Sequence, residues 1–173
     1  MHFLEHYYQN TIKYDLINKF KYNNLNSLPK LKKIVLNFNC KNSDLKQLAA
    51  SFLALELITG QTSILTTVSK PNILLKIRKG QPTGCKIILQ NKVMYKFIER
   101  FIDEILLKSK DLKNFCFKNH RKSNSEKNSF SCKLKNNLIF LELEKNYYLF
   151  NKLVHLNITF ITNNISYNEF IFF

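Results

Sequence analysis

The sequence has few of the residues that mark several protein classes. The 173-residue chain contains 3 Gly, 3 Pro and no Trp, and only 12 Asp and Glu stand against 27 Lys and Arg. No uncharged apolar run reaches the roughly 18 to 20 residues that a membrane-spanning helix needs. The first residues include Glu5 and Asp15, and they lack both the basic and apolar regions of a signal peptide and the Arg-rich, acid-poor composition of a transit peptide. We therefore expect neither a membrane span nor a targeting segment.

Closely spaced metal ligands are also scarce. The four cysteines lie at least 16 positions apart: Cys40, Cys85, Cys116 and Cys132. A zinc site normally draws two ligands from positions two to four residues apart, so these cysteines predict buried or free thiols, with no metal and no disulfide framework. His2 and His6 have a spacing that could bind a metal on a helix, but no third ligand is evident, which favours a fortuitous pair.

The sequence gives little support to a catalytic function. Residues Gly80–Lys86 faintly resemble a phosphate-binding loop, but three residues rather than four separate the glycines, and Pro82 lacks the backbone N–H that such a loop would use. A tight turn between two strands explains this segment better. No carboxylate or nucleophile is placed near His120 or His155. The sequence therefore predicts a protein that is not an enzyme and needs no cofactor.

Excess positive charge is the main feature that is present. The formal net charge is +15, and residues 61–135 supply +12 of it, with 17 basic and 5 acidic side chains. Charge concentrated in this way predicts a face that binds a polyanion, with nucleic acid first and an anionic membrane surface second. Lys accounts for 24 of the basic residues and Asn for 22 positions. Their codons are AT-rich, a composition typical of organelle genomes, which also fits the missing targeting segment.

Periodicity predicts three helices and five strands. Apolar residues recur at helical spacing over 7–20, 43–60 and 93–106, where Ser43-Asp44 could cap the second helix and Gly60 could end it. The apolar stripe of the third helix lies opposite a charge-mixed face, which favours packing on a sheet over a membrane surface or a leucine zipper. The predicted strands are 33–38, 73–77, 85–89, 138–143 and 156–161.

These elements predict an α+β fold, in which an antiparallel or mixed sheet carries helices on one face. We expect one RNA-binding domain over residues 1–173, without internal repeats. It would begin with a helical segment at 1–27, include a polar basic loop at 119–129 and end with a tail at 163–173.

Basic residues gather at predicted strand ends and at one turn. Lys30, Lys32 and Lys33 precede or open the first strand. A second cluster surrounds the Gly80–Gly84 turn: Lys70, Lys76, Arg78, Lys79 and Lys86. Lysines that touch phosphates release condensed counterions, and polar groups on an open sheet face, such as Asn37, can reach ribose hydroxyls and minor-groove edges. This arrangement favours RNA as the polyanion.

The residues resemble the universal large-subunit ribosomal protein five family, which binds 5S ribosomal RNA. Four segments match in order and spacing: Leu28–Phe38, Leu57–Gln61, Lys76–Lys86 and Met94–Arg100. Shorter matches lie at His6–Tyr8, Phe20–Asn23, Leu138–Phe140 and Leu156–Thr159. The resemblance covers about residues 3 to 162 and implies a non-catalytic protein of the central protuberance of the large ribosomal subunit.

The resemblance also implies partners for particular residues. Binding of large-subunit ribosomal RNA, and of 5S RNA where present, would fall on Lys30, Lys33, Asn37, Gln61 and Lys86. The loop from Lys70 to Pro82, with Lys76, Arg78 and Lys79, would contact the peptidyl-site transfer RNA and a protein of the small-subunit head. Neighbouring proteins of the central protuberance are further partners, and no membrane is implied. With the AT-rich composition, this indicates a mitochondrial ribosomal protein of the matrix, encoded by the organelle.

Several positions depart from the family pattern. Ile88 and Gln90 stand where the family usually has Thr and Arg near the 5S contact, and Leu74 replaces a Gly in the basic loop. Asn39-Cys40 replaces a Gly-containing turn, Leu141 replaces a Pro, and the tail at 163–173 stands in place of a C-terminal helix. The alternative functions are a free-standing RNA-binding or RNA-modifying protein of the organelle, and a peripheral membrane protein.

Overall fold

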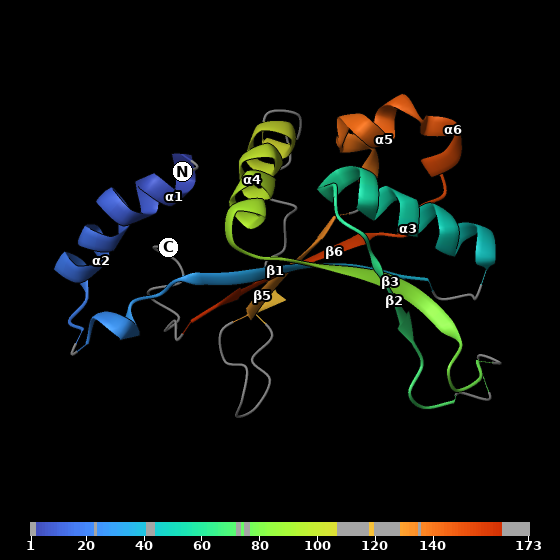
Figure 1. The fold of residues 1–173 in the computed structure, drawn as a ribbon, viewed down its shortest axis with the longest axis horizontal. Coiled ribbons are helices and arrows are strands. Elements are labelled where there is room, and N and C mark those ends of the chain that lie inside the picture. The colour runs from blue at the N-terminus through green and yellow to red at the C-terminus, as the bar shows by residue number, and fades with distance from the viewer. Residues whose placement is uncertain are drawn as a thin grey trace.

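One antiparallel sheet of six strands organises the molecule, with strand order β2-β3-β1-β6-β5-β4 (Figure 1). The strands are β1 (Leu31–Asn39), β2 (Ile64–Thr67), β3 (Pro82–Leu89), β4 (Lys118–Asn119), β5 (Ser129–Leu134) and β6 (Leu156–Thr162). This computed structural model describes residues 3–22, 24–40, 44–71, 74, 77–106, 118–119, 129–134 and 136–163. Every strand pair in these ranges is antiparallel, so the predicted α+β class is confirmed and the sheet is not mixed there.

The helices lie on one side of this sheet (Figure 1). Along the chain they are α1 (Phe3–Tyr7), the π-helical η1 (Tyr8–Ile12), α2 (Lys13–Lys19), α3 (Leu45–Thr59), α4 (Asn91–Phe101), the π-helical η3 (Ile102–Leu106), α5 (Leu141–Lys145) and α6 (Tyr147–Phe150). Among the described residues there are also two 3-10 turns, η2 (Leu25–Ser27) and η5 (Asn137–Ile139). Within the described residues, no helix combines the length and apolar character that crossing a membrane requires.

The core lies between the sheet and the helices because the strands alternate. Ile34, Leu36 and Phe38 on β1 are fully buried, whereas the residues between them are only partly buried. Facing residues on the neighbouring strands and helices complete the core: Cys85, Ile87, Leu89, Cys132, Leu134, Leu156, Ile158, Phe160, Ala54, Leu55, Ile58, Met94 and Phe97. The predicted apolar stripe of the third helix therefore packs on the sheet, as expected.

The limits of α3 follow its sequence signals. Asp44 stands at the N-cap position with extended backbone, although its side chain makes no capping hydrogen bond. Gly60 ends the helix with a φ of 67°, and its N–H donates to the Glu56 carbonyl at 2.7 Å. A left-handed backbone conformation at this point favours glycine, because residues with a Cβ are strained in it. Ser43, the other predicted cap residue, lies outside the described residues.

The prediction of a strand over 138–143 is wrong. This segment forms η5 and α5, and its buried residues Asn137, Phe140 and Leu143 recur every third position rather than every second. The Asn137 amide ties the segment to the sheet, since it donates to the Val154 carbonyl at 2.6 Å and its oxygen accepts from the Leu156 N–H at 3.2 Å. Packing of this segment within the helix layer, against α3 and beside β6, has overridden the local β-propensity.

Three strands were missed, and other predicted segments are only partly described. β2, β4 and β5 have no counterpart in the predicted set. Of the predicted strand 73–77, the structure describes Leu74, which lies in a turn, and Ile77. The ends of the predicted loop 119–129 belong to β4 and β5, and residues 120–128 lie outside the described part, as do Cys116 and 164–173.

The turn predicted between two strands lies before β3. Gly80 occupies the turn with a φ of 83°, whereas Gly84 lies inside β3, opposite Asn39. A Cβ placed on Gly84 would overlap the backbone oxygen of Phe38 and lie 2.9 Å from Thr66 Oγ1. Glycine is needed here because β1 and β2 both approach the strand closely at this residue.

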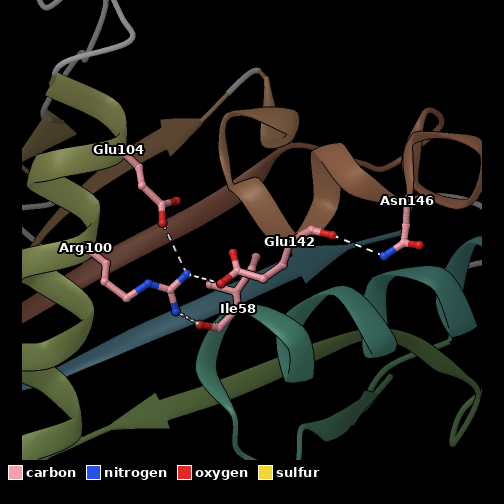
Figure 2. A network of polar contacts seen from close by, with 5 residues as sticks. All are labelled: Ile58, Arg100, Glu104, Glu142 and Asn146. Carbon is pink, nitrogen blue, oxygen red and sulfur yellow. Dashed lines mark hydrogen bonds and ion pairs between the residues drawn. The ribbon is translucent and has the colours of Figure 1, made fainter.

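A polar network fixes the helix layer where α3, α4 and α5 meet (Figure 2). The Arg100 guanidinium donates to the Ile58 carbonyl at 3.1 Å and to Glu104 Oε1 at 3.3 Å, and it also pairs with Glu142. Asn146 Nδ2 donates to the Glu142 carbonyl at 3.4 Å. One guanidinium thus links the C-terminal end of α3 to the start of α5 and to the helical turn that follows α4.

Candidate nucleic-acid interface

The face of the sheet opposite the helices carries a row of polar side chains. Antiparallel register places Asn37 on β1 beside Lys86 on β3 and Asn157 on β6, and Asn157 is in turn beside Lys133 on β5. All four alternate with core residues, so they point to the face that no described helix covers (Figure 1). We call these four residues the open-face row. On the other side of Lys86, its cross-strand neighbour is Ile64 on β2.

Charge is segregated between the two sides of the molecule. The six described strands contain five lysines and no Asp or Glu: Lys32, Lys33, Lys86, Lys118 and Lys133. The described helices carry seven Lys or Arg against eight Asp or Glu. Of these lysines, Lys33, Lys86 and Lys133 alternate with core residues on the open face, so a phosphate backbone approaching that face meets only positive charges from the described strand side chains, whereas the helix side offers both signs.

One member of the open-face row has an unused hydrogen-bonding group. Asn37 Oδ1 is buried and has no hydrogen-bond partner within the described residues. A buried carbonyl oxygen without a donor costs free energy, so its place on a face that can bind a ligand is informative. A hydroxyl or amino group of a ligand could supply that donor.

A long hairpin loop extends from β2 and β3 at one edge of the sheet (Figure 1). Its base is closed by hydrogen bonds from Val68 N–H to the Gln81 carbonyl at 3.1 Å and from Gly80 N–H to the Val68 carbonyl at 2.9 Å. Lys70, Arg78 and Lys79 lie beyond this base and are exposed. The predicted loop residue Lys76 is outside the described part of the chain.

The remaining predicted RNA-binding residues occupy different places. Lys33 is half-buried on β1 and on the same face as Asn37. Lys30 is exposed just before β1, and its carbonyl accepts from the Asn163 N–H at 2.9 Å. Gln61 is exposed after the end of α3, where its N–H donates to Thr59 Oγ1 at 3.3 Å. The structure brings Asn37 and Lys86 together as cross-strand neighbours, but it gives no contact between Gln61 and the row.

Sequence reasoning missed two members of the row, Asn157 and Lys133. Asn157 stands at an alternating position of a correctly predicted strand, so its orientation could have been read from the pattern. Lys133 lies in β5, which was not predicted, so there was no assigned strand on which to place it. In both cases the missing information was which strands are neighbours.

The family departures also have structural places. Ile88 is exposed on the open face opposite Val35, so an apolar side chain interrupts the polar surface there. Gln90 occupies the N-cap position of α4 without a side-chain capping bond. Leu141 is the first residue of α5, a position where proline and leucine are both compatible with a helix because the N–H there has no intrahelical acceptor.

The groups with raised pKa values lie away from the open face. Burial raises the pKa of the Cys85 thiol to about 12 and that of Cys132 to about 11, and both side chains face the core. Burial, followed by the neighbouring Tyr95, raises the pKa of Tyr8 to about 12 at the contact between the N-terminal helix and the body. Cys40, Cys85 and Cys132 are buried free thiols, as predicted. These shifts reflect packing and create no reactive group on the sheet face.

Comparison with known proteins identifies the family. Residues 82–169 match the model of the C-terminal region of the ribosomal L5 family. The chain is 37% identical over 164 residues to the large ribosomal subunit protein uL5m of Reclinomonas americana, covering 94% of this chain and 88% of that protein. It is 32% identical over 168 residues to the large ribosomal subunit protein uL5 of Blochmanniella floridana, covering 96% and 85%. It is 34% identical over 164 residues to the uL5 protein of Wolbachia pipientis, covering 94% and 89%. The chain therefore belongs to the uL5 family of large ribosomal subunit proteins, and it is a structural component of that subunit rather than an enzyme.

Proposed function

We propose that this chain is a mitochondrial uL5 protein of the central protuberance, and that its open sheet face binds ribosomal RNA. The observation that carries the proposal is the open-face row, in which Lys86, Asn37, Asn157 and Lys133 lie side by side on strands that contain no acidic residue. Lys33 adds a further cation on the same face, and Lys30 stands just before it. The partner is large-subunit ribosomal RNA, with 5S RNA included where the ribosome contains it.

The chemistry of the row fits the accessible side of an RNA helix. An A-form helix presents a wide, shallow minor groove with 2′-hydroxyls, whereas its deep major groove excludes side chains. Asn37 Oδ1 can accept a hydrogen bond from such a hydroxyl, and the lysines at either side of the two asparagines can contact phosphates. Binding then depends mainly on charge and helix shape, with little direct reading of base sequence.

The hairpin between β2 and β3 serves a second contact in this proposal. Lys70, Arg78 and Lys79 are exposed beyond the hydrogen-bonded base at Val68 and Gly80, and Lys76, outside the described residues, lies between them in the sequence. We assign this loop to the elbow of the peptidyl-site transfer RNA and to a protein of the small-subunit head. Support comes from the family resemblance and from the exposed cations beyond the closed base of the hairpin.

The mitochondrial assignment has two supports. A mitochondrial-type relative, uL5m of Reclinomonas americana, is 37% identical, while the bacterial relatives named above are 32% and 34% identical. The Lys- and Asn-rich composition also fits an AT-rich organelle genome.

Fractionation of organelles tests the proposal directly. The chain should sediment with large subunits from purified mitochondria in moderate salt, and crosslinking should attach it to ribosomal RNA. The RNA content of the same subunits decides whether 5S RNA is one of its partners. Recovery mainly in light, ribosome-free fractions, or in another compartment, would contradict the assignment.

The loop assignment needs a separate variant. Substituting Lys70, Arg78 and Lys79 by Gln should weaken subunit joining or transfer RNA placement while the chain still enters the large subunit. Substituting Lys86 and Lys133 by Gln removes charge from the sheet instead and should reduce entry into the large subunit. If the loop variant is the one that fails to enter, the loop contacts large-subunit RNA and the assignment is wrong.

A further inference from the structure

Two buried leucines lie outside the main core. Leu16 on α2 is 0% exposed and Leu28, just after η2, is 1% exposed, yet neither belongs to the cluster that fills the space between the sheet and the helices. Large apolar side chains on the same two elements stay exposed, with fractions of 37% for Ile17 and 69% for Leu25. We call these four residues the α2–η2 surface. It is a second apolar region, and its cover is incomplete among the described residues.

The end of β6 directs the following chain towards this surface. β1 and β6 are antiparallel, with Thr162 opposite Leu31. The ladder continues one step further, because the Asn163 N–H donates to the Lys30 carbonyl at 2.9 Å. In an antiparallel pair, each further residue of one strand lies beside an earlier residue of the other. A chain that keeps this direction after Asn163 passes residues 28–29 and then reaches η2.

The end of β6 also meets the N-terminal helices. The Tyr8 hydroxyl on η1 donates to the Pro29 carbonyl at 2.7 Å, next to the Lys30 carbonyl that accepts from Asn163. Asn163 Oδ1 is buried and has no hydrogen-bond partner among the described residues. A buried oxygen without a donor costs free energy, so a further segment that packs here and offers an N–H would be stabilised.

The residues that follow Asn163 fit the surface in composition and in reach. Residues 164–173 carry one charged side chain, Glu169, and six large apolar ones: Ile165, Tyr167, Phe170, Ile171, Phe172 and Phe173. Ten residues extend over roughly 33 Å at most, whereas the 7 residues of α2 form a helix about 10 Å long. The segment can therefore pass η2 and reach α2, where burial of its apolar side chains is favourable.

We propose that residues 164–173 pack on the α2–η2 surface of the same chain and cover its exposed side chains. The segment would then act as a clamp that ties the N-terminal helices to the start of β1. Lys30, Lys32 and Lys33 stand at that point, so the clamp would hold the basic entry to the sheet in place. The contact lies within the chain, and it is independent of which RNA the sheet binds.

Hydrogen exchange of the full-length chain tests the clamp. The triple substitution Phe170→Ser, Ile171→Ser and Phe172→Ser should make the amides of α2 exchange about tenfold faster, while those of β1 and β6 keep their protection. Asn164→Ser with Asn168→Ser is the matched control, because it changes the same segment without removing apolar area. Unchanged protection of α2 in the triple variant, or an equal loss across the whole sheet, would overturn the proposal.

Photo-crosslinking identifies what the segment touches. Full-length chain carrying Phe172→p-benzoylphenylalanine would be assembled into large subunits in its source organism and irradiated after purification. The expected product is a link within the chain to a peptide from residues 13–28. An adduct with RNA, with another protein or with a different part of this chain would overturn the proposal, as would the absence of any adduct. The reciprocal variant, Leu25→p-benzoylphenylalanine, should link to residues 164–173 and serves if the first variant does not assemble.

A substitution on the surface tests the contact from the other side. In the Phe172 crosslinking chain, Leu25→Ser should lower the yield of the internal link several-fold. Tyr148→Ser on α6 is the matched control, since Tyr148 is 73% exposed against 69% for Leu25, and it should leave the yield unchanged. Equal yields from these two variants would contradict a contact at Leu25. Because the link is read within one chain, its loss would leave the RNA assignment of the sheet untouched.

Discussion

The segregation of charge predicts that Lys86 and Lys133, at the two ends of the open-face row, both contact RNA phosphates. Lys86 and Lys133 lie on opposite sides of Asn37 and Asn157, on strands without acidic residues. The double substitution Lys86→Gln and Lys133→Gln removes two charges and keeps side chains of similar length. Because neither lysine contributes to the core, the folded chain should persist, and thermal unfolding would check this.

Counterion release sets the size of the expected effect. Each lost phosphate contact lowers the slope of log affinity against log salt by about 0.9 on a duplex, so the double variant should lose about 1.8. Between roughly 50 and 200 mM salt, that difference in slope changes the affinity ratio of parent to variant about tenfold. The parent chain should therefore bind much better at low salt, and its advantage should shrink as salt rises.

Filter binding of full-length chain to large-subunit ribosomal RNA across a salt series measures this slope. A matched control, Lys145→Gln with Lys152→Gln, removes the same charge from exposed positions on the helix side. The control should leave the slope nearly unchanged. Equal slopes for the two double variants would contradict a role for the sheet face, because net charge alone would then explain the binding.

Three further predictions concern stability. Gly84→Ala should destabilise the fold by about 3 kcal/mol in urea titrations, because the added Cβ overlaps the Phe38 carbonyl oxygen and the sheet must shift; a fully stable variant would contradict the close approach. Arg100→Met should lower the free energy of unfolding by about 2 kcal/mol, because Glu104 and Glu142 then lose their shared cation; this value is reduced because solvent partly screens the pairs. The same urea titration measures the loss, and an unchanged midpoint would show that the network contributes no stability. Burial raises the pKa of Tyr8 to about 12, so its contribution to stability is complete below pH 10 and is lost as pH rises from 10 to 12. Tyr8→Phe should therefore weaken the fall in melting temperature over that pH range while also losing the hydrogen bond to the Pro29 carbonyl, and an identical pH profile would exclude Tyr8 as a cause.

The segment around Phe140 shows why local patterns misplaced one element. Its run of apolar residues has high β-propensity and fits a strand in isolation. In the structure, Phe140 and Leu143 are buried three residues apart, and the side chain of Asn137 binds the backbone beside β6. Which residues of a short apolar run become buried depends on the surface it meets, and that surface comes from α3 and the sheet.

Local patterns in the chain were enough to locate the three longer helical segments and strands β1, β3 and β6, and to predict a negatively charged partner. The alternation in β1 directs Asn37 away from the core, the excess of lysine predicts a polyanion, and Gly60 marks the end of α3 because it adopts the left-handed conformation found there. The position of β6 between β1 and β5, which places Asn157 and Lys133 beside Asn37, emerges only in the packed molecule. Strand order and register are set by burial of the whole sheet under the helices, so contacts between residues far apart in the chain cannot be read from local patterns.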